Sequence, residues 1–343
     1  MHCTCTIIPG DILEKLARDQ KLSKAERQSF SDTAEYDAKW RKVRALRTQA
    51  SSSAQGLLAS GAALAAVPAV TIFNCNKTTS LPGLPVANPG NAADATAKRA
   101  FDETTEVAKF YKALFGRNSI DNLGMTMQSS IHYGVQYNNA FWTGGQMVYG
   151  DGDGQIFVDF TQSNDVIAHE LTHGVTQYSA QLAYANEAGG LNESMSDVFG
   201  SMFRQWRAGQ TSAQADWLIG KDIMGPAALQ RGLTCLRDLA DPAAKHCLAP
   251  QPTKYAQLTP GMDPHYTSGP PNLAFCKAAI AAGGHSWDKV GKVWYRALTG
   301  YAPSRNMKMR TFASRTRRLA KSMFPQDPAL AVAIDNGWKA VGL

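Results

Sequence analysis

The pattern of hydrophobic and polar positions changes near residue 164 of the 343-residue chain. Before this point, short apolar runs bounded by turn-forming residues predict strands, which we place at Val70–Phe73, Ile131–Tyr137, Gln146–Tyr149 and Ile156–Phe160. After it, apolar residues recur at helical spacing, with breaks at Gly189-Gly190, at Gly225-Pro226 and from Pro250 to Pro271. The sequence therefore predicts an α+β fold, with a β-rich lobe over residues 70–163 followed by a helical lobe over residues 164–343.

Two amphipathic helices are expected in the first 50 residues. Ile12, Leu13 and Leu16 lie at helical spacing. A second helical pattern over residues 26–47 brings a set of apolar side chains near one face, namely Phe30, Ala34, Trp40, Val43 and Leu46. Two short helices bury little surface by themselves, since most helical stability comes from tertiary packing. We therefore expect residues 1–50 to dock on the rest of the chain, as a prosegment does.

Residues 51–69 are predicted to form a linker. No charged residue occurs between Ala50 and Asn76, and an uncharged run, GLLASGAALAAVPAVTIF, begins at Gly56. A membrane-spanning helix needs about 20 strongly apolar residues. This run is instead rich in Ala, Gly and Ser and contains Pro68, a composition typical of a flexible linker. We therefore expect no membrane partner.

Charge and cysteine content indicate no specialised partner. The net charge is +7, but the basic excess lies mostly near the two termini and no nucleic-acid-binding motif accompanies it, so no nucleic-acid partner is expected. The six cysteines show no Cys-x-x-Cys spacing. Buried thiols are expected, with a bridge between Cys235 and Cys247 as the alternative. The N-terminus lacks the features of a signal peptide, so export by the standard route is not indicated.

The stretch HELTH, residues 169–173, carries the strongest chemical signal. A helix capped by Ser163 or Asn164 and running to about Tyr178 would set His169 and His173 one turn apart on one face. Two imidazoles in this arrangement can bind one metal ion. Glu170 is rotated by about 100° from His169, which places its carboxylate beside the metal without making it a ligand.

The third metal ligand is expected on the next helix. Glu193 follows the predicted Gly189-Gly190 turn, and Asp197 lies four residues later on the same face. Two histidines and one glutamate with an open fourth position form a catalytic zinc set. A metal-bound histidine usually donates its second N–H to a carboxylate, so Asp197 is predicted to orient His169.

The stretch GDGDG raises the question of calcium. Asp151 and Asp153 have the spacing of an EF-hand loop, but Gln155 occupies the next odd position and the distal glutamate is missing. We therefore expect a tight hairpin leading to the strand at Ile156–Phe160.

Several motifs together resemble the thermolysin family of zinc endopeptidases. They are HELTHGVTQYSAQLAY, NESMSDVFG and NNAFWTGGQMVYGDGDG, and the resemblance extends from about residue 70 to the C-terminus. The opening IIPGDILEKLARD is similar to the short propeptides of the protealysin-like branch. The resemblance implies two lobes with a zinc cleft between them, preceded by a short helical propeptide. It also implies a self-processing precursor whose propeptide serves as intramolecular inhibitor or chaperone.

The resemblance assigns roles to residues of this chain. It makes His169, His173 and Glu193 the zinc ligands and Glu170 the general base, while Tyr184 and His265 hold the oxyanion. Arg237 would bind a substrate carbonyl beyond the cut, and Asn139 and Ala140 would pair with the substrate main chain. Six apolar positions would line the pocket just after the scissile bond and favour cleavage before Leu, Ile, Phe or Val: Phe157, Phe160, Val166, Ile219, Ile223 and Leu236.

Three departures from the family pattern change the expectations. Pro260 occupies the place of the aspartate that orients the second histidine, with Asp263 as the candidate replacement. Where the family binds paired calcium, Asp165 and Asp216 remain, but other residues replace the carboxylates, namely Arg204, Leu218 and Lys221. We therefore expect no calcium there.

The third departure lies in the prosegment, where Pro9-Gly10-Asp11 replaces the Pro-Pro-Tyr of relatives. Inhibition by the prosegment would then be weaker, or would use Ile7, Ile8, or a thiol of Cys3 or Cys5 on zinc.

The sequence thus predicts a monomeric metalloendopeptidase that acts on proteins or peptides and is processed between about residues 50 and 70. A relative that binds peptides without cutting them is the alternative, based on the altered run before His265. An adaptor that uses the basic termini is a further alternative. Non-classical secretion and a cytoplasmic location both remain open, and the family resemblance favours secretion.

Overall fold

A computed structural model describes residues 5–51 and 68–343 of the chain. Cys3, most of the predicted linker and the expected processing region lie outside these residues, as do the side chains of Val43 and Leu46. Within the described ranges, none of the helices is long and apolar enough to cross a membrane.

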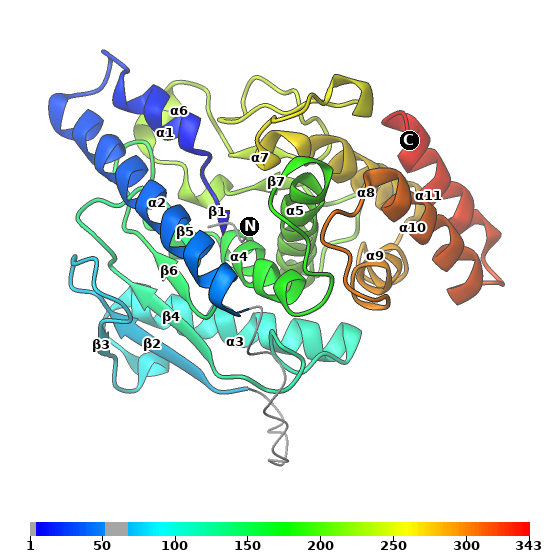
Figure 1. Cartoon of the computed structure of the whole chain (residues 1–343), viewed down its shortest axis with the longest axis horizontal. Helices are drawn as coiled ribbons and strands as arrows, with labels where there is room; N and C mark the ends of the chain where they lie inside the picture. Colours follow the sequence, from blue (N-terminus) through cyan, green and yellow to red (C-terminus); the bar gives the residue numbers. More distant parts are fainter. Residues whose placement is uncertain (1–4, 52–67) are drawn as a thin grey trace.

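One mixed sheet forms the centre of the β-rich lobe (Figure 1). Among the described residues it has six strands in the order β1 (Cys5–Thr6), β5 (Ala140–Trp142), β6 (Met147–Tyr149), β4 (Met127–Ile131), β2 (Val70–Asn74) and β3 (Leu84–Pro85). β4 runs parallel to both β2 and β6, whereas the other pairs are antiparallel. The edge strand β1 comes from the prosegment, so the two ends of the sheet belong to distant parts of the sequence.

Helices surround this sheet and build the second lobe (Figure 1). The prosegment contributes α1 (Gly10–Ala17) and α2 (Lys24–Ser51), and the β-rich lobe contributes α3 (Ala95–Phe115). The remaining helices are α4 (Asn164–Gln177), α5 (Asn186–Ala208), α6 (Pro226–Gln230), α7 (Pro264–Thr267), α8 (Gly269–Ala282), α9 (Val290–Thr299), α10 (Met309–Met323) and α11 (Pro328–Ala340). Short 3-10 turns cover Pro89–Asn91, Phe160–Gln162, Lys221–Ile223 and Tyr255–Gln257, and a small ribbon pairs β7 (Leu218–Ile219) with β8 (Arg237–Asp238).

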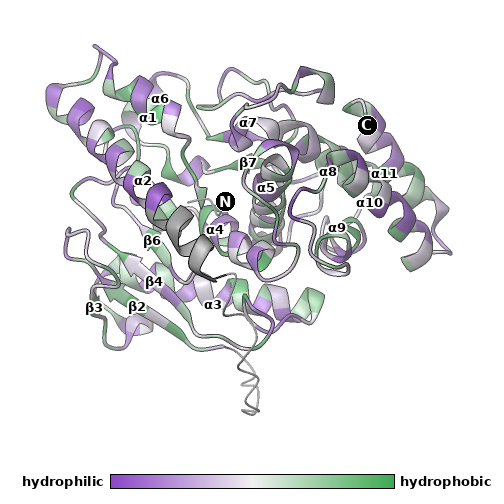
Figure 2. Ribbon diagram, in the orientation of Figure 1, coloured by the Kyte–Doolittle hydropathy of each residue, from purple (hydrophilic) through white to green (hydrophobic). Residues whose placement is uncertain are grey.

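The predicted two-lobed α+β fold is confirmed. Helix α4 joins the lobes, since it packs on α5 on one side and on α3 and β5 on the other. Figure 2 shows purple and green segments alternating along α10 and α11, as expected for helices that turn one face to the core. Helices α4 and α5 are instead buried over most of their length.

Two strand predictions were wrong. Residues 132–137 form no strand, because His132 and Gln136 adopt left-handed backbone conformations with φ of 52° and 49°. The His132 ring is held between Asp94 and Asp151, at 2.9 and 2.7 Å. These contacts join segments far apart in the sequence and outweigh the local β propensity.

The predicted hairpin after GDGDG is also absent, because the turn is closed by a side chain. Asp153 Oδ1 accepts hydrogen bonds from the backbone N–H groups of Gln155, Ile156 and Phe157, at 3.2, 2.9 and 2.9 Å. Of residues 156–160, Phe157 forms an isolated bridge with Met224, and Phe160 begins a 3-10 turn. The apolar run is therefore a core segment that the alternating pattern does not distinguish from a strand.

Glycines 189 and 190 lie inside α5 and form no turn between helices, contrary to the prediction. A Cβ atom at Gly189 would lie 2.8 Å from Pro264 Cγ, and one at Gly190 would lie 2.5 Å from Thr267 Oγ1. The two glycines thus allow α7 to approach α5 closely. The Pro250–Pro271 stretch, expected to be a loop, accordingly contains α7 and the start of α8.

The prosegment docks on the rest of the chain as predicted. Ile12, Leu13 and Leu16 of α1 are buried. Phe30 of α2 is fully buried and packs edge to face on Phe157 of the β-rich lobe, with ring centroids 6.2 Å apart. Apolar contact therefore extends along both prosegment helices.

A buried carboxylate also joins α2 to the β-rich lobe. Asp37 Oδ2 accepts a hydrogen bond from Asn139 Nδ2 at 2.8 Å, and its Oδ1 accepts one from the Tyr137 hydroxyl. Burial raises the pKa of Asp37 to about 6, although these hydrogen bonds and the charges of Arg41 and His265 oppose the shift. Docking therefore favours the protonated carboxyl.

The close approach of α5 and α7 predicts that Gly190→Ala destabilises the protein. Alanine is favoured over glycine within a helix by about 1 kcal/mol, but the added methyl would press on Thr267. We expect a net loss of about 1–3 kcal/mol in the free energy of unfolding, measured by urea titration. Gly145→Ala is the control, because a Cβ there meets nothing within 4 Å. Equal stability of the two variants would contradict the packing argument.

Asp37 predicts a pH-dependent contribution to stability. Because its folded pKa of about 6 exceeds the ordinary 3.8, the contribution is full below about pH 4 and is lost as the pH rises through 6. Asp37→Asn lacks this loss. Between pH 4 and 7, its free energy of unfolding should therefore rise relative to that of wild type by up to about 3 kcal/mol. Urea titrations at several pH values test this, with the half-exposed Asp32→Asn on the same helix as control. A pH-independent difference would refute it.

Candidate active site

The metal-ligating residues predicted from sequence come together between α4 and α5. His169 and His173 lie one turn apart on α4, with their Nε2 atoms 3.1 Å apart. Glu193 on α5 faces both rings, with Oε2 3.4 Å from His169 Nε2 and Oε1 3.4 Å from His173 Nε2. Metal–ligand bonds of about 2.0–2.1 Å in a tetrahedral site require ligand separations of about 3.3 Å. The donor triangle therefore has the dimensions of a zinc site.

The proton positions on the two rings support the same assignment. His169 donates Nδ1–H to Asp197 Oδ1 at 2.9 Å, as predicted from the sequence for this pair, so its Nε2 carries a lone pair. Asn192 donates its Nδ2–H to the Leu182 carbonyl, so its Oδ1 accepts Nδ1–H of His173 at 2.9 Å. Two Nε2 lone pairs thus face each other. A cation between them satisfies such an arrangement, and the residues fit zinc.

The site is enclosed and rich in negative charge. Glu170 and Glu193 are fully buried, and one oxygen of each, Oε1 and Oε2 respectively, has no hydrogen-bond partner. Burial opposes ionisation of Glu193, but His265 and His173 hold its pKa well below the usual range. Burial raises the pKa of Glu170 well above the usual range, and its Oε2 accepts the Trp142 N–H at 3.0 Å. Unsatisfied buried carboxylate oxygens again point to a cation.

Asp263 orients His265, which Pro260 cannot do because its side chain has no hydrogen-bonding group. It caps α7, and its Oδ1 accepts both the backbone N–H and the Nδ1–H of His265, at 2.9 and 2.7 Å. His265 Nε2 in turn donates to the Thr6 carbonyl at 2.6 Å. Both ring nitrogens therefore carry protons. Burial opposes this charge, but Glu193 and Asp263 raise the pKa of His265 to about 9.

Tyr184 lies on the same side of the donor triangle as His265. Its hydroxyl donates to Glu193 Oε1 and lies 3.3 Å from His265 Nε2. Two hydrogen-bond donors thus converge beside the site at which the metal ligands meet. This is the arrangement needed to hold a developing oxyanion.

The residues expected to bind substrate main chain hold the prosegment instead. β1 pairs antiparallel with β5, so that Cys5 lies opposite Trp142. Ile7 N–H donates to the Ala140 carbonyl at 3.1 Å, and Ile8 N–H donates to Asn139 Oδ1 at 2.9 Å.

Arg237 is the third group in this set, and its Nη1 donates to the Ile7 carbonyl at 3.1 Å. Strand addition of this kind is a common mode of peptide binding.

The six predicted pocket residues are all buried in the same apolar core as Ile7 and Ile8: Phe157, Phe160, Val166, Ile219, Ile223 and Leu236. That core extends through both lobes, so the burial of the six residues agrees with an apolar lining. Asp11, the residue that departs from the aromatic of relatives, bonds outside this core, where its Oδ2 accepts the Tyr266 hydroxyl at 2.5 Å.

Two residues that contribute to the site were not predicted from the sequence. Asn192 orients His173, as described above. Asn272 on α8 donates to Asp197 Oδ2 at 2.9 Å, beside the two hydrogen bonds from Arg237 at 2.8 and 2.9 Å. The packing of α8 on α5 determines the position of Asn272, and no local pattern in the sequence indicates this packing. Asn192 had a signal, since it immediately precedes the expected ligand Glu193.

Ion pairs fill the region in which the sequence predicts that no calcium binds. Arg204 Nη1 lies 2.7 Å from Asp222 and 3.4 Å from the fully buried Asp165. Lys221 forms an ion pair with Asp216. The carboxylates that remain are thus neutralised by side chains of the protein itself.

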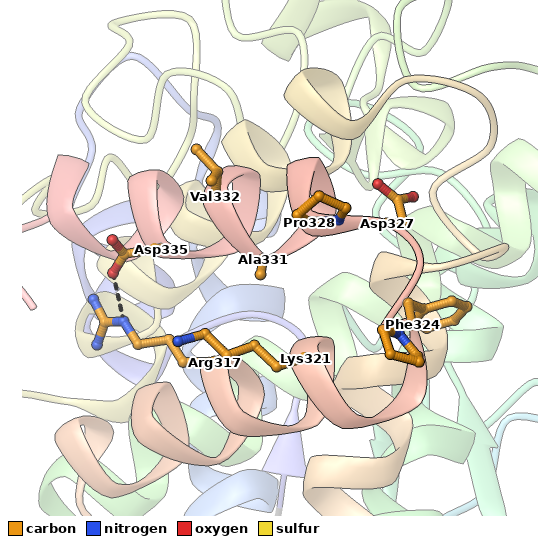
Figure 3. A pocket seen from close by; sticks show the side chains of 9 residues that line it. Arg317, Lys321, Phe324, Asp327, Pro328, Ala331, Val332 and Asp335 are labelled. Carbon is orange, nitrogen blue, oxygen red and sulfur yellow. Dashed lines mark hydrogen bonds and ion pairs between the residues drawn. The ribbon is translucent and has the colours of Figure 1, made fainter.

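Other clusters are separate from this site. Cys235, His246 and Cys247 have potential donor atoms within 4.8 Å of one another, and the two sulfurs are 3.7 Å apart and form no disulfide. A surface groove lies between α10 and α11 (Figure 3), where Arg317 pairs with Asp335 at 2.8 Å. The groove is lined by neither histidine nor cysteine. We assign it no catalytic role.

Comparisons with known proteins agree with the geometry. The family model described as the thermolysin metallopeptidase catalytic domain matches residues 33–177, and the one for its alpha-helical domain matches residues 180–343. An extracellular metalloprotease of Pectobacterium carotovorum subsp. carotovorum is 39% identical over 284 residues, 80% of each chain. Protease PrtS of a Photorhabdus species is 37% identical over 283 residues, covering 80% of this chain and 76% of that protein.

A solved structure extends the likeness to the prosegment. The precursor of protealysin, a metalloproteinase from Serratia proteamaculans, superimposes with a TM-score of 0.82 at 33% sequence identity. The match covers 98% of this chain and 99% of that one. Together with the family models, this likeness shows that the chain belongs to the thermolysin family of metallopeptidases and is related to the protealysin precursor.

Proposed function

We propose that the chain is the precursor of a zinc endopeptidase that cuts peptide bonds before bulky hydrophobic residues and processes itself. The observation that carries the proposal is the triangle of His169, His173 and Glu193 donor atoms, 3.1–3.4 Å apart, with the Glu170 carboxylate beside it. Membership of the metallopeptidase family supports the reaction class.

The three donors would hold the zinc ion, which when bound acidifies a water molecule and polarises the scissile carbonyl. Glu170 accepts the proton of the attacking water and delivers it to the leaving nitrogen, acting as base and then as acid. His265 and Tyr184 donate hydrogen bonds to the oxyanion.

Substrate would bind along β5 in the direction that the prosegment now takes. Ala140 and Asn139 would hold its main chain, and Arg237 would bind the carbonyl after the cut, as they bind Ile7 and Ile8 here. The buried, apolar character of the six predicted pocket residues supports a preference for Leu, Ile, Phe or Val directly after the cut. The intact prosegment then acts as an intramolecular inhibitor.

The alternative of a peptide-binding relative without activity rests on the altered run before His265. The contact of Asp263 with His265 supplies the orientation that Pro260 cannot, which favours the enzyme. The extracellular metalloprotease among the relatives favours secretion. We propose a monomer that cuts proteins or peptides outside the cell, with no nucleic-acid or membrane partner.

The full chain and its Glu170→Gln variant test the proposal, with Glu103→Gln on the surface of α3 as a control. We expect all three to bind one zinc ion, measured by native mass spectrometry. Hydrolysis of a denatured protein should fall at least about 100-fold in Glu170→Gln, with cuts before bulky apolar residues in the other two. Only these two should lose their prosegment over time.

Other outcomes separate the alternatives. Zinc binding without hydrolysis, even after the prosegment has been removed by an added protease, would favour the peptide-binding alternative. Absence of zinc would overturn the assignment of the site.

The ion pairs around Arg204 predict that calcium does not stabilise the protein. Two calcium ions cannot favourably replace the contacts of Arg204 with Asp165 and Asp222. A bound ligand at 100 times its Kd would add about 2.7 kcal/mol of stability. We expect no measurable rise in Tm when millimolar calcium is added at constant zinc. A rise comparable to that ligand effect would disprove this prediction.

A further inference from the structure

The thiol of Cys5 lies beside the donors assigned to zinc. Potential ligand atoms of Cys5, His173 and Glu193 lie within 4.8 Å of one another, and all three residues are buried. The pairing of β1 with β5 sets Cys5 opposite Trp142, and β1 also contacts α4 (Figure 1). The register of the sheet therefore determines the position of the sulfur.

The donor triangle leaves one position of a tetrahedral zinc ion open. Beside it, Glu170 Oε1 and Glu193 Oε2 are fully buried atoms without a hydrogen-bond partner, which is the mark of a cation site. A zinc–sulfur bond of about 2.3 Å places the sulfur about 3.6 Å from a neighbouring ligand atom. Because the ligand atom of Cys5 lies within 4.8 Å of those of His173 and Glu193, a shift on the order of 1 Å brings the thiol to a ligand distance.

We propose that the thiolate of Cys5 is the fourth ligand of the zinc ion in the precursor. This inference rests on the zinc site of the proposed function and adds to it a ligand from the prosegment. On binding, the thiol loses its proton to solvent and its sulfur donates an electron pair to the metal, so no atom changes oxidation state.

The proposal explains why a segment bound like a substrate stays intact. His265 donates to the Thr6 carbonyl and Arg237 to the Ile7 carbonyl, the contacts assigned to the two carbonyls of a substrate on either side of the cut. The Thr6–Ile7 bond therefore lies where a bond would be broken, with an apolar residue after it. Sulfur in the fourth position excludes the water that Glu170 would activate.

Zinc-edge X-ray absorption on the intact precursor tests the proposal without relying on activity. All samples carry Glu170→Gln, so that the prosegment is retained. We expect one sulfur at about 2.3 Å among nitrogen and oxygen ligands, and its loss in the additional variant Cys5→Ser. Cys247→Ser is the matched control, because it removes one thiol of the cluster Cys235, His246 and Cys247, which could also hold a metal ion among the described residues. Its spectrum should keep the sulfur.

Each other result has a distinct meaning. One bound zinc without a sulfur ligand would overturn the role of Cys5 and leave the proposed function standing. A sulfur that persists in Cys5→Ser would assign the ligand to another thiol. Failure to bind zinc would refute the proposed function itself. As a second measurement on the chain with Glu170 intact, Cys5→Ser should raise the initial rate of peptide hydrolysis by the precursor.

Discussion

The buried carboxylate of Asp197 is the interaction on which the site depends. It accepts hydrogen bonds from His169 on α4, Arg237 on β8 and Asn272 on α8, and it lies on α5 itself. The charges of Arg237 and His169 overcome the effect of burial and lower its pKa to about 2. A buried charge is tolerated only with such partners, and removing one partner of a buried pair costs several kcal/mol. The proposed metal ligand His169 and the proposed substrate-binding group Arg237 are therefore fixed by the same anion.

The prosegment is bound by the same groups that a substrate would need. β5 would be an open sheet edge without β1, and an unpaired edge readily accepts another strand. Residues 5–8 cover this edge, so that backbone groups of β5 find hydrogen-bond partners and the site is covered at the same time. The buried contacts of Phe30 and Asp37 then extend the interface to α2. The prosegment helices provide most of the buried area of this interface, and strand β1 provides the specific hydrogen bonds. Release of the prosegment therefore requires both to separate from the rest of the chain.

The sequence predicted the parts of the site that depend on helical spacing. His169, Glu170 and His173 lie within five residues, and Glu193 and Asp197 within another five, so periodicity alone sets their relative positions. Asp263 was identified as a candidate in a different way, from the departure of Pro260 from the family pattern. The long-range groups were different. Asn272 reaches Asp197 only because α8 packs on α5, and no spacing in the sequence indicates that contact.

Strand errors have a related physical cause. Residues 131–137 alternate as a strand does, but the backbone is left-handed at His132 and Gln136, and the His132 ring is held by partners that are distant in sequence. Residues 156–160 are apolar because they are core, and the backbone N–H groups of Ile156 and Phe157 bond to the Asp153 carboxylate and not to a neighbouring strand. Local pattern measures burial well, but it measures backbone pairing only indirectly.

The position of His265 shows how tertiary packing determines a catalytic detail. Its orienting residue, Asp263, lies in the cap of a four-residue helix, which is too short to be stable alone. That helix is held against α5 because Gly189 and Gly190 leave room for Pro264 and Thr267. The glycines that would ordinarily weaken a helix therefore determine how closely His265 approaches Glu193, which lies on the same helix. Replacing the orienting residue at Pro260 by one at Asp263 is compatible with the fold only because this close packing fixes α7.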